Sequence, residues 1–197
     1  MSPAVTVFGG SFDPVHAAHL EVARRALGQV PCDEVWFLPA TRAVHKPAGP
    51  RAPAEHRRAM LEAALAGVEC LRICDLELEH GVARRSLESV TELSTRWPGH
   101  RWYFLIGEDS FRQLESWYRP EEIFRIAAPV VAPRPGSGGE RAAEWRGIPV
   151  RWLAGDEIDL DSTAIRAALA RGEVPAGLDP GVMEYIREHG LYREQQG

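Results

Sequence analysis

The sequence predicts an α/β protein built around a doubly wound parallel sheet with helices on both faces. Three observations lead to this fold class. The 197 residues are 45% apolar, which is enough to bury one large core. Short and almost continuously apolar runs alternate with segments of helical periodicity, and such runs are typical of parallel strands that are covered on both faces. Right-handed crossovers would then give a Rossmann-like domain over 1–197, whose ligands bind beyond the carboxyl ends of the strands.

Six short apolar runs bounded by turn residues are expected to form the strands. They are Ala4–Phe8, Glu34–Leu38, Leu71–Cys74, Trp102–Ile106, Pro129–Ala132 and Val150–Leu153. Helical periodicity ends before Gly28, Gly67 and Pro98, and two more helices are expected at Thr163–Arg171 and Pro180–His189. The chain therefore ends in a helical segment at about 162–192. Pro133–Glu140 is rich in glycine and proline and predicts a mobile surface loop.

Composition excludes several classes of protein. The net charge of -5 argues against general binding to nucleic acid or to a membrane surface. The three cysteines, Cys32, Cys70 and Cys74, show neither a CxxC motif nor a zinc-like spacing, which is typical of reduced thiols. No apolar run approaches the length of a transmembrane helix, and the N-terminus lacks the basic and apolar regions of a leader. We expect a cytoplasmic protein.

The stretch GGSFDPVHAAH, Gly9 to His19, follows the first predicted strand and indicates an anion site. Asp13 followed by Pro14 predicts a helix N-cap with proline at the first helical position. His16 and His19 are three residues apart and would share one helical face, near the unpaired amides of the helix start. Two glycines let the backbone approach a phosphate without a Cβ in the way. The motif therefore predicts phosphate binding.

Two other interpretations of the histidines remain open. An HxxH pair can bind zinc, although no carboxylate or cysteine stands at a supporting spacing nearby. The two histidines could also be unrelated surface residues on a helix.

A family resemblance favours the phosphate interpretation. GGSFDPVHAAH, together with DSTAIR at Asp161 to Arg166, resembles the HxGH and SSTxIR motifs of a nucleotidyltransferase superfamily. Within it the chain resembles the bacterial nicotinate mononucleotide adenylyltransferases. Six further segments carry this resemblance in order: VHKP (44–47), EHRRAML (55–61), DLEL (75–78), LIGEDSFRQLESW (105–117), VAPRPG (131–136) and YIREHGLY (185–192).

The resemblance implies an enzyme of NAD biosynthesis, with ATP and nicotinate mononucleotide as its partners. The phosphate of the mononucleotide would attack the α-phosphorus of ATP without a covalent enzyme intermediate, giving nicotinate adenine dinucleotide and pyrophosphate. Such a reaction needs alignment and charge neutralisation more than a strong base. Mg²⁺ would enter with ATP and bridge its phosphate oxygens, with no metal site made by protein ligands alone. A homo-oligomer is one possible state of assembly.

The resemblance also assigns residues. The catalytic groups would be His16, His19 and Arg166. The ATP site would contain Gly9, Gly10, Ser11, Phe12, His16, His19, Asp109, Arg134, Ser162, Thr163 and Arg166. The site for nicotinate mononucleotide would contain His45, Lys46, Arg84, Arg85, Ser86 and Trp117. From the residues alone, Asp161 or Ser162 predicts an N-cap that exposes amides to an anion, and Trp117 is either a stacking platform or a half-buried core aromatic.

Three departures from the family pattern stand in these motifs. Ala18 replaces the glycine of HxGH, which favours the helix by roughly 1 kcal/mol but adds a methyl group where ATP is expected. Asp161 replaces the first serine of SSTxIR and brings a negative charge toward the triphosphate. Ser86, Glu88 and Ser89 replace a Thr-x-Asp-Thr pattern near the pyridine ring.

Two other functions therefore stay open. One is a different transferase of the superfamily, acting on nicotinamide mononucleotide, on pantetheine phosphate or with a cytidylyl group. The other is a nucleotide-binding protein of the same fold that has lost turnover through Ala18 and Asp161.

Overall fold

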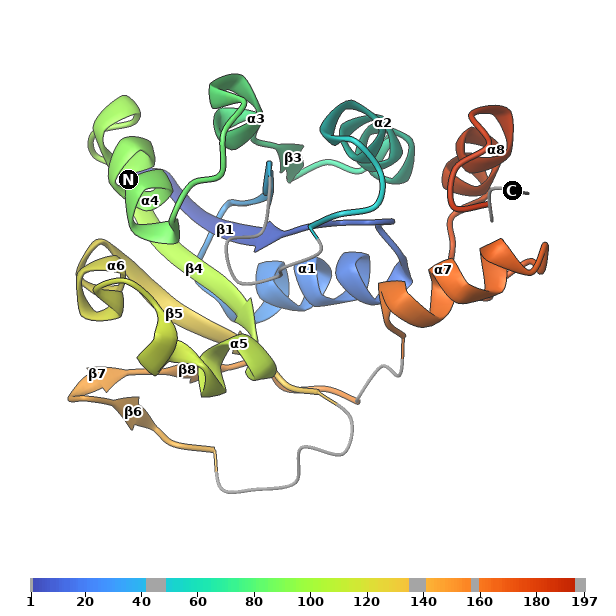
Figure 1. Cartoon of the computed structure of the whole chain (residues 1–197). Helices are drawn as coiled ribbons and strands as arrows, with labels where there is room; N and C mark the ends of the chain where they lie inside the picture. The colour runs from blue at the N-terminus through green and yellow to red at the C-terminus, as the bar shows by residue number, and fades with distance from the viewer. Residues whose placement is uncertain (1, 42–48, 135–140, 157–159, 194–197) are drawn as a thin grey trace.

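A computed structural model describes residues 2–41, 49–134, 141–156 and 160–193 (Figure 1). Its centre is a six-stranded, wholly parallel sheet in the order β3-β2-β1-β4-β5-β8. The strands are β1 (Ala4–Gly10), β2 (Glu34–Pro39), β3 (Leu71–Ile73), β4 (Arg101–Gly107), β5 (Ala127–Ala132) and β8 (Arg151–Trp152). This is the strand order of a Rossmann-like fold, so the predicted fold class is confirmed.

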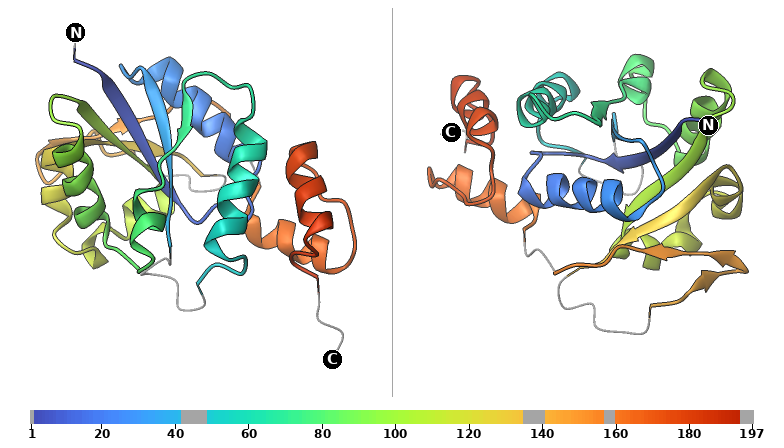
Figure 2. Two further views of the ribbon diagram at one scale, coloured as in Figure 1. Left: turned by 90° about the horizontal axis from the view of Figure 1, so that it is seen from above. Right: turned by 180° about the vertical axis from the view of Figure 1, so that it is seen from behind.

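Helices cover both faces of the sheet (Figures 1 and 2). The main helices are α1 (Ala17–Gln29), α2 (Ala54–Leu65), α4 (Ser86–Arg96), α6 (Pro120–Ile126), α7 (Ser162–Ala170) and α8 (Pro180–Glu188). Shorter elements are α3 (Leu76–His80), α5 (Glu108–Arg112), a 3₁₀ turn at Leu114–Ser116 and a hairpin of β6 (Glu144–Trp145) and β7 (Ile148–Pro149).

Alternation along β1 divides the apolar interior into two cores. Ala4 and Phe8 belong to the core that includes residues of α1, α2, α7 and α8. Val5 and Val7 belong to the core on the other face, with residues of α4 and α6. A central parallel strand must be apolar on both faces, which is why its sequence reads as a continuous apolar run.

The chain end packs back onto the body of the protein. Helix α8 lies beside α2 (Figures 1 and 2), and its Val182 and Ile186 are buried in the same core as Met60 and Leu61 of α2. The two C-terminal helices were predicted, and their bounds differ from the expected ones by one residue at each of three ends. Among the described residues, none of the helices is long and apolar enough to cross a membrane.

The predicted start of the first helix is wrong. Helix α1 begins at Ala17 with His16 as its N-cap, so Asp13 and Pro14 lie in the preceding turn. The Asp13 carboxylate instead accepts the backbone N–H groups of Arg51 at 2.7 Å and Ala52 at 3.0 Å. Asp13 binds amides 38 or more residues away rather than those of the next helix, because the amides before α2 need a hydrogen-bond acceptor where they are shielded from water.

Several short elements were not predicted. Helices α3, α5 and α6 have five to seven residues, too few for a helical periodicity to stand out. Most of the predicted loop, residues 135–140, lies outside the described residues.

Candidate active site

A cavity of about 290 Å³ opens at the carboxyl ends of β1 and β4. Strand order reverses between these two strands, which is where open α/β sheets bind ligands. Ten of the predicted ATP-site residues line it: Gly9, Gly10, Ser11, Phe12, His16, His19, Arg134, Ser162, Thr163 and Arg166. Residues 153 positions apart in the chain, such as Asp13 and Arg166, are thus brought to one site.

The turn after β1 forms the floor of the cavity. Phe12 is 1% exposed and has a positive φ of 49°, a backbone conformation that L-residues rarely adopt. Its ring lies so close to Gly10 that a Cβ there would stand 2.8 Å from Phe12 Cζ. Glycine at position 10 is therefore required by the side chain of Phe12.

His16 and His19 lie together at the start of α1. Their ring centroids are 3.8 Å apart, and Nδ1 of His19 accepts the backbone N–H of His16 at 3.3 Å. Burial lowers the pKa of His16 to about 4; the carboxylate of Asp161 raises this pKa and the guanidinium of Arg134 lowers it. His16 is therefore neutral at pH 7, and the residue is 5% exposed. Its buried Nδ1 has no hydrogen-bond partner within the described part of the chain.

A second helix start, that of α7, faces the same cavity. Oδ1 of Asp161 accepts the backbone N–H groups of Thr163 and Ala164, which makes Asp161 the N-cap and lowers the pKa of its carboxyl. Ser162 Oγ donates to the carbonyl of Pro14 at 3.1 Å. The DSTAIR segment is thereby fixed to the turn that precedes α1.

Arg166 is held one turn further along α7. Its Nη1 donates to the carbonyl of Asp13 at 2.7 Å, and its Nη2 donates to Thr163 Oγ1 at 3.2 Å. A guanidinium with five donors can make both bonds and still offer donors to an anion in the cavity.

Arg134 lies across the cavity, on the segment after β5. Its guanidinium pairs with Asp109 at 3.0 Å, and its backbone N–H donates to Glu108 at 3.2 Å. Glu108 is buried and also pairs with Arg112. Asp109 does not line the cavity and reaches it only through Arg134.

The described residues among those predicted for the second substrate lie apart from this cavity. Arg84, Arg85 and Ser86 lead into α4, with Arg85 as N-cap, and Trp117 follows the 3₁₀ turn. The Arg85 guanidinium stacks on the ring of Tyr118, 4.5 Å from its centroid, which joins the start of α4 to the segment of Trp117. His45 and Lys46 lie outside the described residues.

Arg84 and Trp117 also have protein partners. Arg84 is 13% exposed and pairs with Glu92 at 2.6 Å. Trp117 is half-buried and packs edge-on to Phe104, with ring centroids 6.3 Å apart. Ser89 lies in the segment that departs from the family's Thr-x-Asp-Thr pattern. It is fully buried and donates its hydroxyl to Glu77 at 2.7 Å.

Sequence reasoning missed a buried polar network behind the cavity. Arg57 is fully buried and donates through Nε, Nη1 and Nη2 to the carbonyls of Ala52, Ser11 and Thr41. It thereby connects the ends of β1 and β2 to the start of α2. One signal was present, because Arg57 shares the α2 face of Met60 and Leu61, where a charged residue must find internal partners.

Further residues that line the cavity were also missed. Val22, Arg25, Leu153, Asp156 and Leu160 line it. Arg25 Nη1 donates to the carbonyl of Asp156 at 2.6 Å, which fixes the segment after β8 against α1. Apolar side chains beside backbone groups suit a flat heterocycle.

Within the described part of the chain, no group of three or more His, Cys, Asp or Glu side chains could hold a metal ion. The zinc interpretation of His16 and His19 thus finds no third ligand there. Oδ1 of Asp161, the nearest acidic group at the α7 start, is already used by two backbone amides.

The chain is similar to known proteins over nearly its whole length. The family model described as cytidylyltransferase-like matches residues 7–168. A probable nicotinate-nucleotide adenylyltransferase of Solibacter usitatus is 38% identical over 190 residues, which cover 95% of this chain and 98% of the relative. One of Chromobacterium violaceum is 36% identical and covers 98% and 100% of the two chains. The Plasmodium falciparum nicotinic acid mononucleotide adenylyltransferase complexed with NaAD has a similar fold, with a TM-score of 0.79 at 18% identity over 96% of this chain and 97% of that one.

Proposed function

The chain belongs to the cytidylyltransferase-like family and, within it, to the nicotinate-nucleotide adenylyltransferases, and we propose that it transfers the adenylyl group of ATP to nicotinate mononucleotide. The products are nicotinate adenine dinucleotide, a precursor of NAD, and pyrophosphate. One observation carries the proposal: the starts of α1 and α7 face a single cavity at the switch point of the sheet. The proposal places one nucleotidyltransferase domain, residues 1–197, in the cytoplasm.

The reaction is a displacement at the α-phosphorus of ATP. A phosphate oxygen of the mononucleotide forms a bond to this phosphorus, and the bond to the oxygen that bridges to the β-phosphorus breaks. Pyrophosphate leaves with the electron pair. The attacking phosphate is already an anion at neutral pH, so the site needs no strong base. It needs donors placed where negative charge grows on the leaving group.

His16, His19 and Arg166 are the donors that the proposal uses. His16 is neutral at pH 7, since burial lowers its pKa to about 4, and it binds as a dipolar donor rather than as a cation. Arg166 supplies the positive charge and is oriented by the carbonyl of Asp13. The amide of Ser162 lies in the first turn of α7, where a phosphate is favoured, while the amide of Thr163 is bonded to Asp161 and only the Thr163 hydroxyl remains for the ligand.

The residues present fit a magnesium ion that is held mainly by the nucleotide. Mg²⁺ usually keeps several waters and is bound by one or two carboxylates together with substrate phosphates. Asp161 is the acidic side chain at the α7 start that could contact such an ion directly or through water. When bound, the ion would neutralise charge on the triphosphate.

The positions of the other residues indicate their roles in the proposed reaction. The part of the cavity lined by the apolar side chains of Val22 and Leu153 would hold the adenine ring, and Asp109 with Arg134 would contact the ribose or the phosphates. On the other side, the start of α4 would present backbone amides to the nicotinate carboxylate, next to Arg85 and Ser86. Trp117, which packs edge-on to Phe104, would stack on the pyridine ring.

Pyrophosphate release with ATP tests the function. Nicotinate mononucleotide is expected to support turnover, while nicotinamide mononucleotide and pantetheine phosphate support less. A variant with both His16 and His19 changed to alanine is the negative control. Turnover with pantetheine phosphate alone would favour another transferase of the superfamily. ATP binding without turnover on any substrate would favour the nucleotide-binding protein.

A further inference from the structure

The C-terminal segment is hydrogen-bonded to the turn that carries the histidines. Tyr192, 179 positions after Asp13, donates its hydroxyl to Oδ1 of Asp13 at 2.7 Å. Burial and the Asp13 carboxylate raise the pKa of Tyr192, so its hydroxyl keeps its proton and remains a donor at working pH. None of the roles described above uses this residue.

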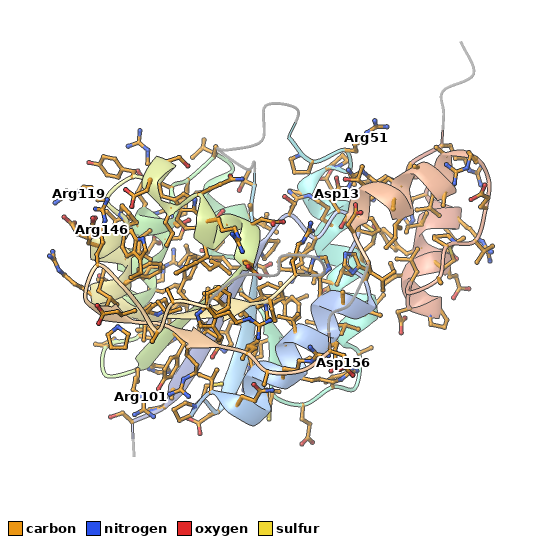
Figure 3. The ribbon with its side chains drawn as sticks, turned by 90° about the horizontal axis from the view of Figure 1, so that it is seen from below. Asp13, Arg51, Arg101, Arg119, Arg146 and Asp156 are labelled. Carbon is orange, nitrogen blue, oxygen red and sulfur yellow. The ribbon has the colours of Figure 1, made fainter. Side chains whose placement is uncertain are left out.

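Asp13 is the point where three segments meet. Figure 3 shows it beside Arg51, between the start of α2 and the C-terminal helices. Asp13 is 4% exposed, its carboxylate accepts the backbone amides of Arg51 and Ala52, and its Oδ2 lies 3.8 Å from Nη1 of Arg166. The same Nη1 donates to the Asp13 carbonyl. Any movement of Asp13 therefore moves the cation that faces the triphosphate.

The backbone after α8 is shaped to deliver Tyr192. Gly190 has a φ of 60°, the amide of Gly190 donates to the carbonyl of Arg187, and the amide of Leu191 donates to that of Ile186, which is a Schellman ending. Tyr192 itself has a φ of 63°. A non-glycine residue keeps this unfavourable conformation only where its surroundings hold it, and such strain is common at functional sites.

We propose that Tyr192 is a positioning residue for ATP: its hydroxyl fixes the Asp13 carboxylate, and Asp13 fixes Arg166 against the triphosphate. The inference rests on the proposed function, because it deepens the ATP side of the same site. The effect belongs to ATP rather than to the mononucleotide, since Arg166 is the cavity cation that Asp13 contacts directly.

The test removes the hydroxyl and keeps the ring. Tyr192→Phe is expected to lower kcat/KM for ATP roughly ten-fold, the size of one lost hydrogen bond to a charged group, with the KM for nicotinate mononucleotide within about two-fold of the wild type. Tyr185→Phe is the matched control, because Tyr185 lies on α8 and its hydroxyl bonds to His56 at 3.0 Å, away from the cavity. This control should leave both substrates unaffected. Equal losses for the two substrates, or equal behaviour of the two variants, would overturn the proposal.

ATP binding measured by calorimetry without the second substrate separates this inference from the proposed function. If the wild type binds ATP but transfers nothing, the proposed function fails, and the ten-fold weaker ATP binding of Tyr192→Phe is still expected. A cycle with Arg166→Ala adds a second test. If Tyr192 acts through Arg166, Tyr192→Phe should weaken ATP binding less than about two-fold in that background, because the two effects share one path. Fully additive losses of ATP binding would refute an effect of Tyr192 through Arg166.

Discussion

Nδ1 of His19 accepts the backbone N–H of His16, and the two imidazole rings lie with centroids 3.8 Å apart. A ring nitrogen that accepts a hydrogen bond carries no proton, so His19 in its neutral form has its proton on Nε2. The pair therefore needs no net charge to present N–H donors. Arg166, which lines the same cavity, would then supply positive charge to the proposed phosphate site.

Loss of either histidine should reduce turnover with little loss of folded protein. His16→Ala or His19→Ala is expected to lower kcat about 100-fold to 1000-fold, as is typical for one preorganised donor. His19→Ala also removes the acceptor of the His16 amide and should destabilise the fold by about 1 kcal/mol. Steady-state rates and urea unfolding measure the two effects. His80→Ala, at an exposed histidine outside the cavity, is the control, and near-normal turnover in both variants would contradict a phosphate role.

His16 should make stability depend on pH. Its pKa is 6.5 in the unfolded chain and about 4 in the fold, so the unfolded state binds more protons between these values. The free energy of unfolding is therefore unaffected by His16 above pH 6.5 and falls as the pH drops toward 4, by at most about 3 kcal/mol. Urea unfolding of His16→Gln should show a shallower acid loss than the wild type. An identical pH profile in the two proteins would mean that His16 is solvated.

The sequence predicted the parallel sheet because β1, β2, β4 and β5 are long enough for their apolar pattern to be visible and are buried on both faces. It predicted the meeting of Gly9, His19 and Arg166 only through the family resemblance. Spacing alone cannot place residues of α1 and α7 in one cavity, since they are separated by almost the whole chain.

The sequence did not predict hydrogen bonds between residues that are far apart in the chain. Asp13 before a proline has the local pattern of an N-cap, yet its acceptors are taken by Arg51, Ala52 and Tyr192, far along the chain. A buried carboxylate chooses the partners that folding brings to it, and local pattern carries no information about them. For the same reason, the sequence did not predict the three carbonyl groups to which Arg57 donates.

Ala18 lines the cavity from the first turn of α1 and is 9% exposed. Ala18→Gly restores the family pattern and removes one methyl group. We expect a lower KM for ATP and a melting temperature lower by about 2 to 4 °C, since glycine costs up to about 1 kcal/mol in a helix. Initial rates and thermal unfolding provide the two values. An unchanged or higher KM would show that the cavity already accommodates alanine.

The last prediction concerns the choice between nicotinate and nicotinamide mononucleotide. A site that binds a carboxylate leaves its donors poorly matched when a neutral amide enters, so kcat/KM should favour the acid by at least about ten-fold. The start of α4 supplies backbone amides, with Arg84 and Arg85 beside them. Changing both arginines to alanine should reduce the preference, and measurement of kcat/KM on the two mononucleotides gives it directly.

The structure indicates that Arg84 and Arg85 contribute unequally to the expected preference for nicotinate mononucleotide. Arg84 is 13% exposed and its charge is matched by Glu92, whereas Arg85 stacks on the exposed ring of Tyr118. Arg85→Ala should therefore account for most of the loss of preference, and Arg84→Ala for less. Arg96→Ala removes another partner of Glu92 at the far end of α4 and serves as the control. A full preference in the double variant would assign the nicotinate carboxylate to the backbone amides of α4 alone, because no side-chain charge at positions 84 and 85 would then be needed to hold it.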